Sequence, residues 1–105
     1  MSSIFTKIIT REIPSRIEYE DDFVIVIHDI APKAKTHLLV IPKKEIESTE
    51  FLSKDDTSLI AHMFFVIQEM TRKLWIEKGY QLHINSGKSA GQEVMHLHIH
   101  LLSDL

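Results

Sequence analysis

The sequence contains no cysteine, so the chain can form neither a disulfide bond nor a zinc site built on thiolate ligands. Long apolar runs are missing as well, and no stretch approaches the roughly 20 residues that a membrane-spanning helix needs. The N-terminus lacks the apolar core of a signal peptide. We therefore expect a cytoplasmic protein with no membrane partner.

Basic residues are outnumbered by acidic ones. Lys and Arg total 12 against 15 Asp and Glu, which gives a net charge of -3. Proteins that bind nucleic acid polymers usually carry a basic face, so such a polymer is not an expected partner. At 105 residues we expect one domain over residues 1–105, small enough that pairing with a second copy would help it bury apolar surface.

Glycine is scarce, and two of the three glycines fall in one loop, residues 85–92. This loop leads into residues 91–102, where His96, His98 and His100 alternate with large aliphatic residues. Side chains two apart share a face in an extended strand but diverge on a helix. The alternation predicts one strand over residues 91–102 with three imidazoles on one face.

The rest of the pattern predicts an α+β fold. Residues 4–12 have the apolar spacing of a short helix capped by Ser2 or Ser3, and a long helix is predicted from Ser53 to a terminating Gly79. Strands are expected over residues 16–20, 23–28, 36–41, 80–85 and 91–102. The order favours an antiparallel five-stranded sheet with the long helix on one face.

Three roles compete for the row of histidines. A solvated strand face is one, and metal binding is another, although three ligands about 6–7 Å apart along one strand suit a tetrahedral ion poorly. Catalysis is favoured, because neutral imidazole is a nucleophile and a proton carrier near pH 7. The central His98 is flanked on both sides and is the best candidate for the nucleophile. Phosphorus is a suitable electrophile, since the preceding loop can offer amides to anionic oxygens.

At this point the sequence resembles a known family. His96-Leu97-His98-Ile99-His100-Leu101-Leu102 matches the histidine-triad (HIT) signature, three alternating histidines followed by two apolar residues, and residues 91–94 match what precedes it there. Further similarity to the HINT branch, the histidine triad nucleotide-binding proteins, covers residues 4–9, 12–14, 28–30, 36–44, 79–80 and Asn85.

The resemblance implies a HIT-like fold whose sheets join across a homodimer. It implies binding of purine nucleoside monophosphates of the AMP or GMP type and hydrolysis of nucleoside phosphoramidates at the P–N bond. His98 would attack phosphorus and form a nucleotidyl-histidine intermediate, with no metal and no cofactor required. His96 and His100 would orient His98 and bind phosphate oxygens, and His37 would join them as a fourth histidine.

The resemblance also assigns nucleotide contacts, most of them with a plainer alternative. Asp29 would bind the ribose hydroxyls or simply form a turn, and Asn85 would face the phosphate or serve as a turn residue. The base pocket would be lined by Phe5, Ile8, Ile27, His28 and Ile30, of which the aliphatic residues are nearly as well suited to the core. Three nucleotide-binding candidates lead into the triad, Gln92, Glu93 and Val94: Val94 would contribute its backbone, and Glu93 would contact the leaving amine or remain solvated.

The resemblance leaves the substrate open. The family strand usually continues into a Gly-Gly-Arg segment and a C-terminal tail near the leaving group, whereas this sequence stops at residues 103–105. A dinucleoside polyphosphate hydrolase of the related fragile-histidine-triad (Fhit) branch would use the same His98. A non-catalytic nucleotide-binding or scaffold protein would keep the same fold. His83 shares a predicted strand face with Asn85 and has no assigned role.

Overall fold

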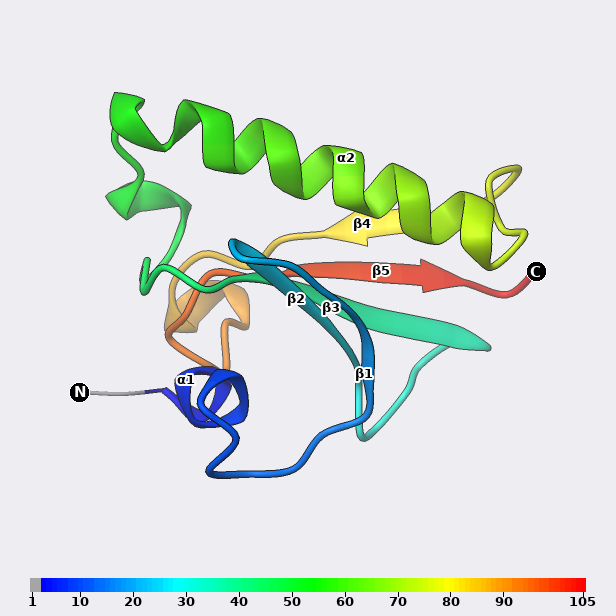
Figure 1. Cartoon of the computed structure of the whole chain (residues 1–105), viewed down its shortest axis with the longest axis horizontal. Coiled ribbons are helices and arrows are strands. Elements are labelled where there is room, and N and C mark those ends of the chain that lie inside the picture. The colour runs from blue at the N-terminus through cyan, green and yellow to red at the C-terminus, as the bar shows by residue number, and fades with distance from the viewer. Residues whose placement is uncertain (1–2) are drawn as a thin grey trace.

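Five antiparallel strands and two α-helices form the fold in the computed structural model, which describes residues 3–105 (Figure 1). The strands are β1 (Ile17–Glu20), β2 (Val24–His28), β3 (Thr36–Pro42), β4 (Gln81–His83) and β5 (Ile99–Ser103). The helices are α1 (Ile4–Ile9) and α2 (Thr57–Lys73), with 3-10 turns at Thr49–Phe51, Lys54–Asp56 and Lys88–Ala90. The predicted α+β fold, a five-stranded antiparallel sheet with one long and one short helix, is confirmed.

The last strand, β5, lies in the interior of the sheet. The strand order is β1-β2-β3-β5-β4, and every neighbouring pair is antiparallel. After β3 the chain leaves the sheet to form α2, adds β4 at the far edge and returns to place β5 between β3 and β4. This topology puts His37 of β3 and His100 of β5 on neighbouring strands.

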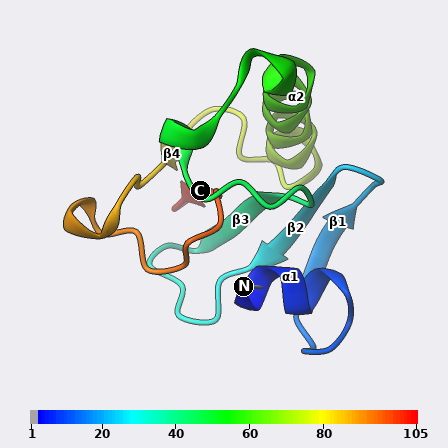
Figure 2. The ribbon, with the colours of Figure 1, turned by 90° about the vertical axis from the view of Figure 1, so that its left-hand side faces the viewer.

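The two faces of the sheet carry different partners (Figure 2). One face packs on α2 through a core that includes Leu38, Val40, Ile99 and Leu101. Since side chains alternate along a strand, their sequence neighbours project to the other face. There α1 covers a second cluster of buried residues: Phe5, Ile8, Ile25, Ile27, Leu39 and Ile41. His37, His98 and His100 therefore belong to the face away from α2.

The predicted strand over residues 91–102 is too long. β5 begins only at Ile99, so one of the three alternating histidines, His100, lies in regular strand. The pairing of β3 with β5 ends at Val40 and Ile99, and two residues further along β3 is Pro42, which has no N–H to donate. The amide of Leu97 instead donates to the Ile46 carbonyl oxygen, at 2.6 Å, in the loop after β3.

The N-terminal helix is shorter than predicted. Ser3 caps α1, since its hydroxyl accepts a hydrogen bond from the Thr6 amide, whereas Ser2 lies outside the described residues. The helix ends at Ile9, because Arg11 adopts a left-handed φ of 67°. The amides of Arg11 and Glu12 then donate to carbonyls of the last turn, the hydrogen-bond pattern of a Schellman cap.

The long helix also ends before the predicted Gly79. Ser53 and Asp56 form a reciprocal capping box ahead of it, as its sequence indicated. At the other end Trp75 has a φ of 60°, and the Ile76 amide donates to the Thr71 carbonyl at 2.9 Å. A tryptophan thus occupies the left-handed position that glycine usually takes. Among residues 3–105, no helix combines the length and apolar character that crossing a bilayer requires.

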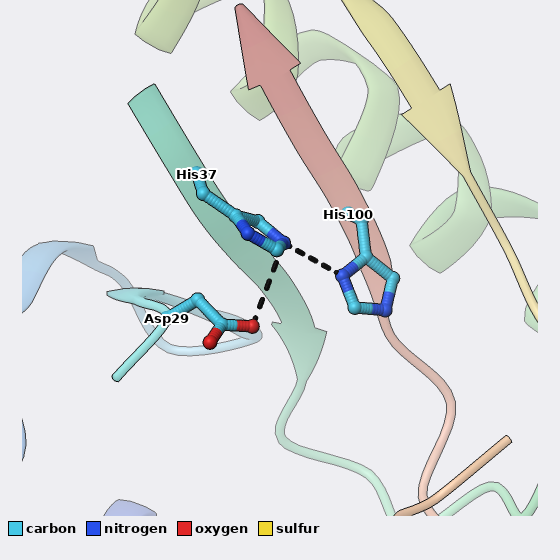
Figure 3. A group of neighbouring side chains, drawn as sticks. All are labelled: Asp29, His37 and His100. Carbon is cyan, nitrogen blue, oxygen red and sulfur yellow. Dashed lines mark hydrogen bonds and ion pairs between the residues drawn. The ribbon is translucent and has the colours of Figure 1, made fainter. Parts of the chain in front are cut away.

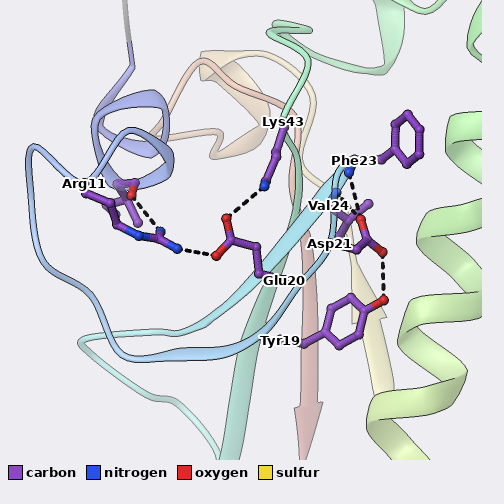
Figure 4. A network of polar contacts seen from close by, with 8 residues as sticks. Arg11, Tyr19, Glu20, Asp21, Phe23, Val24 and Lys43 are labelled. Carbon is purple, nitrogen blue, oxygen red and sulfur yellow. Dashed lines mark hydrogen bonds and ion pairs between the residues drawn. The ribbon is translucent and has the colours of Figure 1, made fainter.

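The carboxylate of Asp21, in the β1–β2 turn, holds the hairpin together (Figure 4) and also pairs with α2. Asp21 accepts hydrogen bonds from the amides of Phe23 and Val24, each at 2.8 Å, and from the Tyr19 hydroxyl at 2.7 Å. Its other close partner is His62 Nε2 of α2, at 2.6 Å. Burial opposes ionisation of Asp21, but these hydrogen bonds outweigh it and bring its pKa to about 2. His62 is half-buried and is paired with Asp21.

Candidate active site

His98 is the most constrained of the three alternating histidines. Its Nδ1 lies 2.7 Å from the carbonyl oxygen of His96, and its ring meets the edge of Phe5 with centroids 5.0 Å apart. A carbonyl can only accept, so Nδ1 carries the proton and, in the neutral ring, Nε2 keeps its lone pair. Burial lowers the pKa of His98, which keeps the ring neutral near pH 7. The side chain therefore presents a neutral imidazole nitrogen of a defined tautomer.

The His96 side chain is buried and bonded within the protein. Its side chain is 1% exposed, its Nε2 lies 2.8 Å from the Pro42 carbonyl oxygen and its Nδ1 lies 2.9 Å from the Ser3 hydroxyl. Both ring nitrogens are thus occupied by the protein. The geometry supports the predicted orienting role, through the backbone carbonyl, but leaves the His96 ring no free nitrogen for a phosphate oxygen.

His37 and His100 form a directed hydrogen-bond chain (Figure 3). The Lys33 amide donates to His37 Nδ1 at 3.1 Å, so His37 carries its proton on Nε2. That proton points to His100 Nδ1, at 2.9 Å, with Asp29 Oδ2 at 3.5 Å as a second acceptor. His100 must then hold its own proton on Nε2. The chain leaves an N–H donor on His100 beside the lone pair of His98, whose ring centroid is 5.0 Å away.

Burial and neighbouring imidazoles keep this chain uncharged. Burial is the main cause that lowers the pKa of His37, although the Asp29 carboxylate acts in the opposite direction. For His100, burial together with His98 and His37 lowers the pKa to about 4. Near pH 7 both rings are neutral, and their protons sit where the hydrogen bonds place them.

Asp29, His37 and His100 could also supply ligand atoms to a metal ion. Single ligand atoms of Asp29, His37 and His100 lie within 4.8 Å of one another, a spacing that a metal ion could bridge. Metal binding at His37 Nε2 would require the proton to move to Nδ1, which faces the Lys33 N–H. The hydrogen-bond pattern therefore favours a proton-sharing chain over a metal centre at these three side chains.

Asp29 lies beside this chain at the end of β2. Its Oδ1 accepts a hydrogen bond from the Ala31 amide at 2.8 Å, which is the turn geometry anticipated as the alternative role. Its Oδ2 lies 3.5 Å from His37 Nε2 and is the carboxylate oxygen on the side of the histidines. The adjacent Ile30 is 98% exposed and packs on nothing in the described chain.

His28 does not join the other histidines. Its neighbours Ile25 and Ile27 face α1, so the alternation of β2 directs the His28 ring to the α2 face. There its Nε2 lies 2.8 Å from Glu18 Oε1, and Glu18 also pairs with Lys73 of α2 at 2.7 Å. The predicted base-pocket role for this side chain conflicts with its position.

The remaining predicted base-pocket residues are already packed. Phe5, Ile8 and Ile27 are at most 7% exposed and belong to the cluster under α1, as their alternative assignment to the core anticipated. Val94 packs against the same cluster. Phe5 nevertheless contacts both His96 and His98, so this cluster forms the apolar wall of the site.

Gln92 braces the glycine loop instead of facing a ligand. Its side-chain oxygen accepts from the Gly87 amide at 2.8 Å, and its amide nitrogen donates to the carbonyls of Glu47 and Val94 at 2.7 and 3.0 Å. The side chain is 3% exposed, and both its N–H groups are used. The predicted phosphate contact therefore has no free donor on Gln92.

The Asn85 side chain is also bonded within the glycine loop, whereas the Glu93 side chain is exposed. The Asn85 amide donates to the Ala90 carbonyl at 2.9 Å, across the loop that Gly87 and Gly91 shape with φ near 90°. Glu93 is exposed, and its charge acts on His98 in the direction that raises the pKa of that ring. Glu93 thus remains available to a ligand that approaches His98.

Sequence reasoning missed three parts of this site. The Ser3 hydroxyl and the Pro42 carbonyl hold His96, and the Lys33 amide sets the tautomer of His37. No sequence pattern marks such contacts, because they join segments far apart in the chain. The third part is His83, which pairs directly with His100 across β4 and β5. The alternation of Gln81, Leu82 and His83 was a usable signal for that placement.

A family model and related sequences match this chain over nearly its whole length. A family model described as "Scavenger mRNA decapping enzyme C-term binding" matches residues 2–105. An uncharacterized HIT-like protein from Chlamydia muridarum is 46% identical over 102 residues, which cover 97% of this chain and 81% of the relative.

Solved structures agree along almost the whole chain. A HIT family hydrolase from Legionella pneumophila superposes with a TM-score of 0.95 at 37% identity, covering 99% of this chain and 94% of the other. A HIT family hydrolase from Clostridium thermocellum gives 0.94 at 41% identity, with 99% and 91% covered. A histidine triad nucleotide-binding protein from Candida albicans gives 0.86 at 33% identity, with 95% and 73% covered.

Proposed function

Because this chain belongs to the histidine-triad (HIT) family, we propose that it is a hydrolase that splits purine nucleoside phosphoramidates at the P–N bond. The observation that supports this most is the tautomer of His98, whose Nδ1 is held by the His96 carbonyl at 2.7 Å. A neutral imidazole with one free nitrogen is a competent nucleophile toward phosphorus, and the His98 side chain is 7% exposed.

The reaction then runs in two displacements. His98 Nε2 forms a bond to the α-phosphorus while the P–N bond breaks, and the leaving amine takes a proton from solvent. Water next attacks phosphorus and loses a proton to solvent, while the bond to Nε2 breaks and the nucleoside monophosphate is released. The His100 Nε2–H donates a hydrogen bond to a phosphoryl oxygen, where negative charge builds up in each step. The scheme uses no metal and no cofactor.

Around this centre the nucleotide would lie across the sheet. The Asp29 carboxylate, at the end of β2, accepts the ribose hydroxyls through the oxygen that faces His37. The base lies beyond it against the Phe5 cluster, with the exposed Ile30 closing over it. The loop braced by Gln92 bounds the phosphate side, where Asn85, Glu93 and the Val94 backbone lie.

We also propose that two copies associate through β4. This strand forms an edge of the sheet, so its outer backbone groups are free to pair with a second β4. Apolar side chains on α2 and beside β4 are 41–65% exposed: Phe64, Phe65, Tyr80 and Ile84. Sedimentation velocity tests this directly, and a species of monomer mass at micromolar concentration would contradict it.

A substrate panel tests the proposed activity. Purified wild-type protein should release amine from adenosine and guanosine phosphoramidates, and His98→Ala should abolish release while still binding AMP. Chelator treatment should leave the rate unchanged. Faster cleavage of dinucleoside polyphosphates would favour the Fhit-like activity. Nucleotide binding with equal inertness of wild type and His98→Ala would favour a non-catalytic binding protein.

A further inference from the structure

A fifth histidine, His83, lies on the same face of the sheet as the site. In β4, Leu82 packs against the core under α2, so its neighbours Gln81 and His83 project to the opposite face. His83 is directly paired with His100, and directly opposed side chains have Cβ atoms about 4.5–5.5 Å apart. His83 is also exposed, so its ring is open to a ligand.

The strand order shows which part of a substrate His83 would meet. Asp29 follows β2, His37 lies on β3, His100 on β5 and His83 on β4, so the four side chains follow the sheet from one side to the other. Under the proposed function, the ribose is at Asp29 and the reacting phosphate is at His98 and His100. The next position along this row, at His83, is then left for the group that departs.

We propose that His83 is a specificity-determining residue for the leaving group, donating an imidazole N–H to an anionic oxygen that the leaving group carries. This inference rests on the proposed function for the placement of the nucleotide. An imidazole has at least one N–H donor in either protonation state, and hydrogen bonds to charged acceptors are the stronger ones. Amines that bear a carboxylate, such as amino acids, and phosphate-bearing leaving groups share this chemistry.

His83 also acts on the residues beside it. Its charge is among the causes that lower the pKa of His37 and of His100, which places it within electrostatic reach of both rings. Glu93 is an exposed carboxylate near His98 and would favour a cationic leaving group instead. Because Glu93 and His83 favour opposite charges, the contribution of His83 to substrate preference is measured by comparing variants that all keep Glu93.

The test uses two ligands that differ in one group. AMP joined through its phosphorus to the amine of glycine carries a carboxylate, and AMP joined to ethylamine carries a methyl group in that position. His83→Val should reduce the kcat/KM ratio of the first to the second by about tenfold, the usual scale for a hydrogen bond to a charged group. His83→Lys, which restores a donor, should recover most of the ratio. A dinucleoside tetraphosphate, compared with both, distinguishes a phosphate from a carboxylate as the preferred anion.

Two controls keep the inference separate from the proposed activity. Gln81→Val changes the same face of β4 two residues from His83 and should leave the ratio unchanged. The affinities of both ligands are also measured by calorimetry with His98→Ala and with His98→Ala/His83→Val, which need no turnover. Wild-type protein that cleaves neither ligand refutes the phosphoramidase, while the affinity ratio still tests His83. A ratio unchanged by His83→Val, or changed equally by Gln81→Val, overturns the inference.

Discussion

The carbonyl oxygen of His96 lies 2.7 Å from Nδ1 of His98, and this contact fixes which nitrogen of His98 is free. His96 thus contributes its backbone carbonyl to this contact, and His98 contributes its side chain. His96 is anchored at both ring nitrogens by Ser3 and Pro42, so its carbonyl cannot easily turn away. The nucleophile of the proposed reaction is therefore selected by a backbone group of its neighbour.

The pH dependence of the proposed reaction follows from this neutral ring. Burial lowers the pKa of His98 from its usual value near 6.5, so the reactive neutral form persists as the pH falls through that value. We expect kcat/KM to be flat from pH 8 to about 6.5 and to decline only below it. Rates measured in overlapping buffers, with circular dichroism at each pH to verify folding, check this. A decline centred above pH 7 would contradict it.

Removing His37 should disturb His100 without touching the nucleophile. In His37→Ala, His100 Nδ1 loses the donor that lies 2.9 Å away, so its proton is free to move between its two nitrogens. A loss of roughly 10²-fold in kcat is expected, within the range for groups that take part in proton placement. His62→Ala, which removes a histidine of α2, should keep the wild-type kcat. Comparable kcat losses in the two variants would mean that His37 acts only through stability.

Gln92→Ala should destabilise the glycine loop. The substitution leaves the Gly87 amide and the carbonyls of Glu47 and Val94 without the partner that each has now. We expect the free energy of unfolding to fall by about 2–3 kcal/mol, since three partly buried hydrogen bonds would be lost. Urea unfolding followed by circular dichroism measures this. Glu93→Ala, at the exposed neighbouring position, should change it by less than about 0.5 kcal/mol.

Asp21 should dominate the loss of stability in strong acid. Its pKa of about 2 in the folded chain is below the value near 3.9 of an unfolded chain. The unfolded state therefore binds more protons between these values, so the stabilisation is complete above about pH 4 and is lost as the pH falls toward 2. The pKa of His100 is lowered to about 4, so this residue makes stability fall in a separate pH range, as the pH drops from about 6.5 to 4. Asp21→Ala should flatten only the lower window, as seen by urea unfolding at pH 2.5, 4 and 7.

Periodicity predicted the sheet, both helices and the grouping of His98 with His100, because all of these depend on local spacing. It misplaced the C-terminal ends of both helices, since Arg11 and Trp75 occupy left-handed positions that are usually taken by glycine. It also extended the histidine strand too far, because the pairing with β3 ends at Ile99 and the amide of Leu97 donates to the loop after β3 instead. The predicted roles of His28 and Gln92 conflict with the structure for different reasons. The His28 ring lies on the α2 face of the sheet, and the Gln92 side chain is used within the glycine loop, and neither placement can be read from local spacing.

The interior position of β5 has a consequence for how the protein is made. His37 and His100 are 63 positions apart in the chain, and their strands become neighbours only when β5 enters between β3 and β4. During synthesis β1 to β4 emerge before β5, so the edges of β3 and β4 that pair with β5 have no partner until it arrives. A nascent chain therefore lacks the contact between His37 and His100, and these two unpaired edges are where the β5 of a second chain could be exchanged.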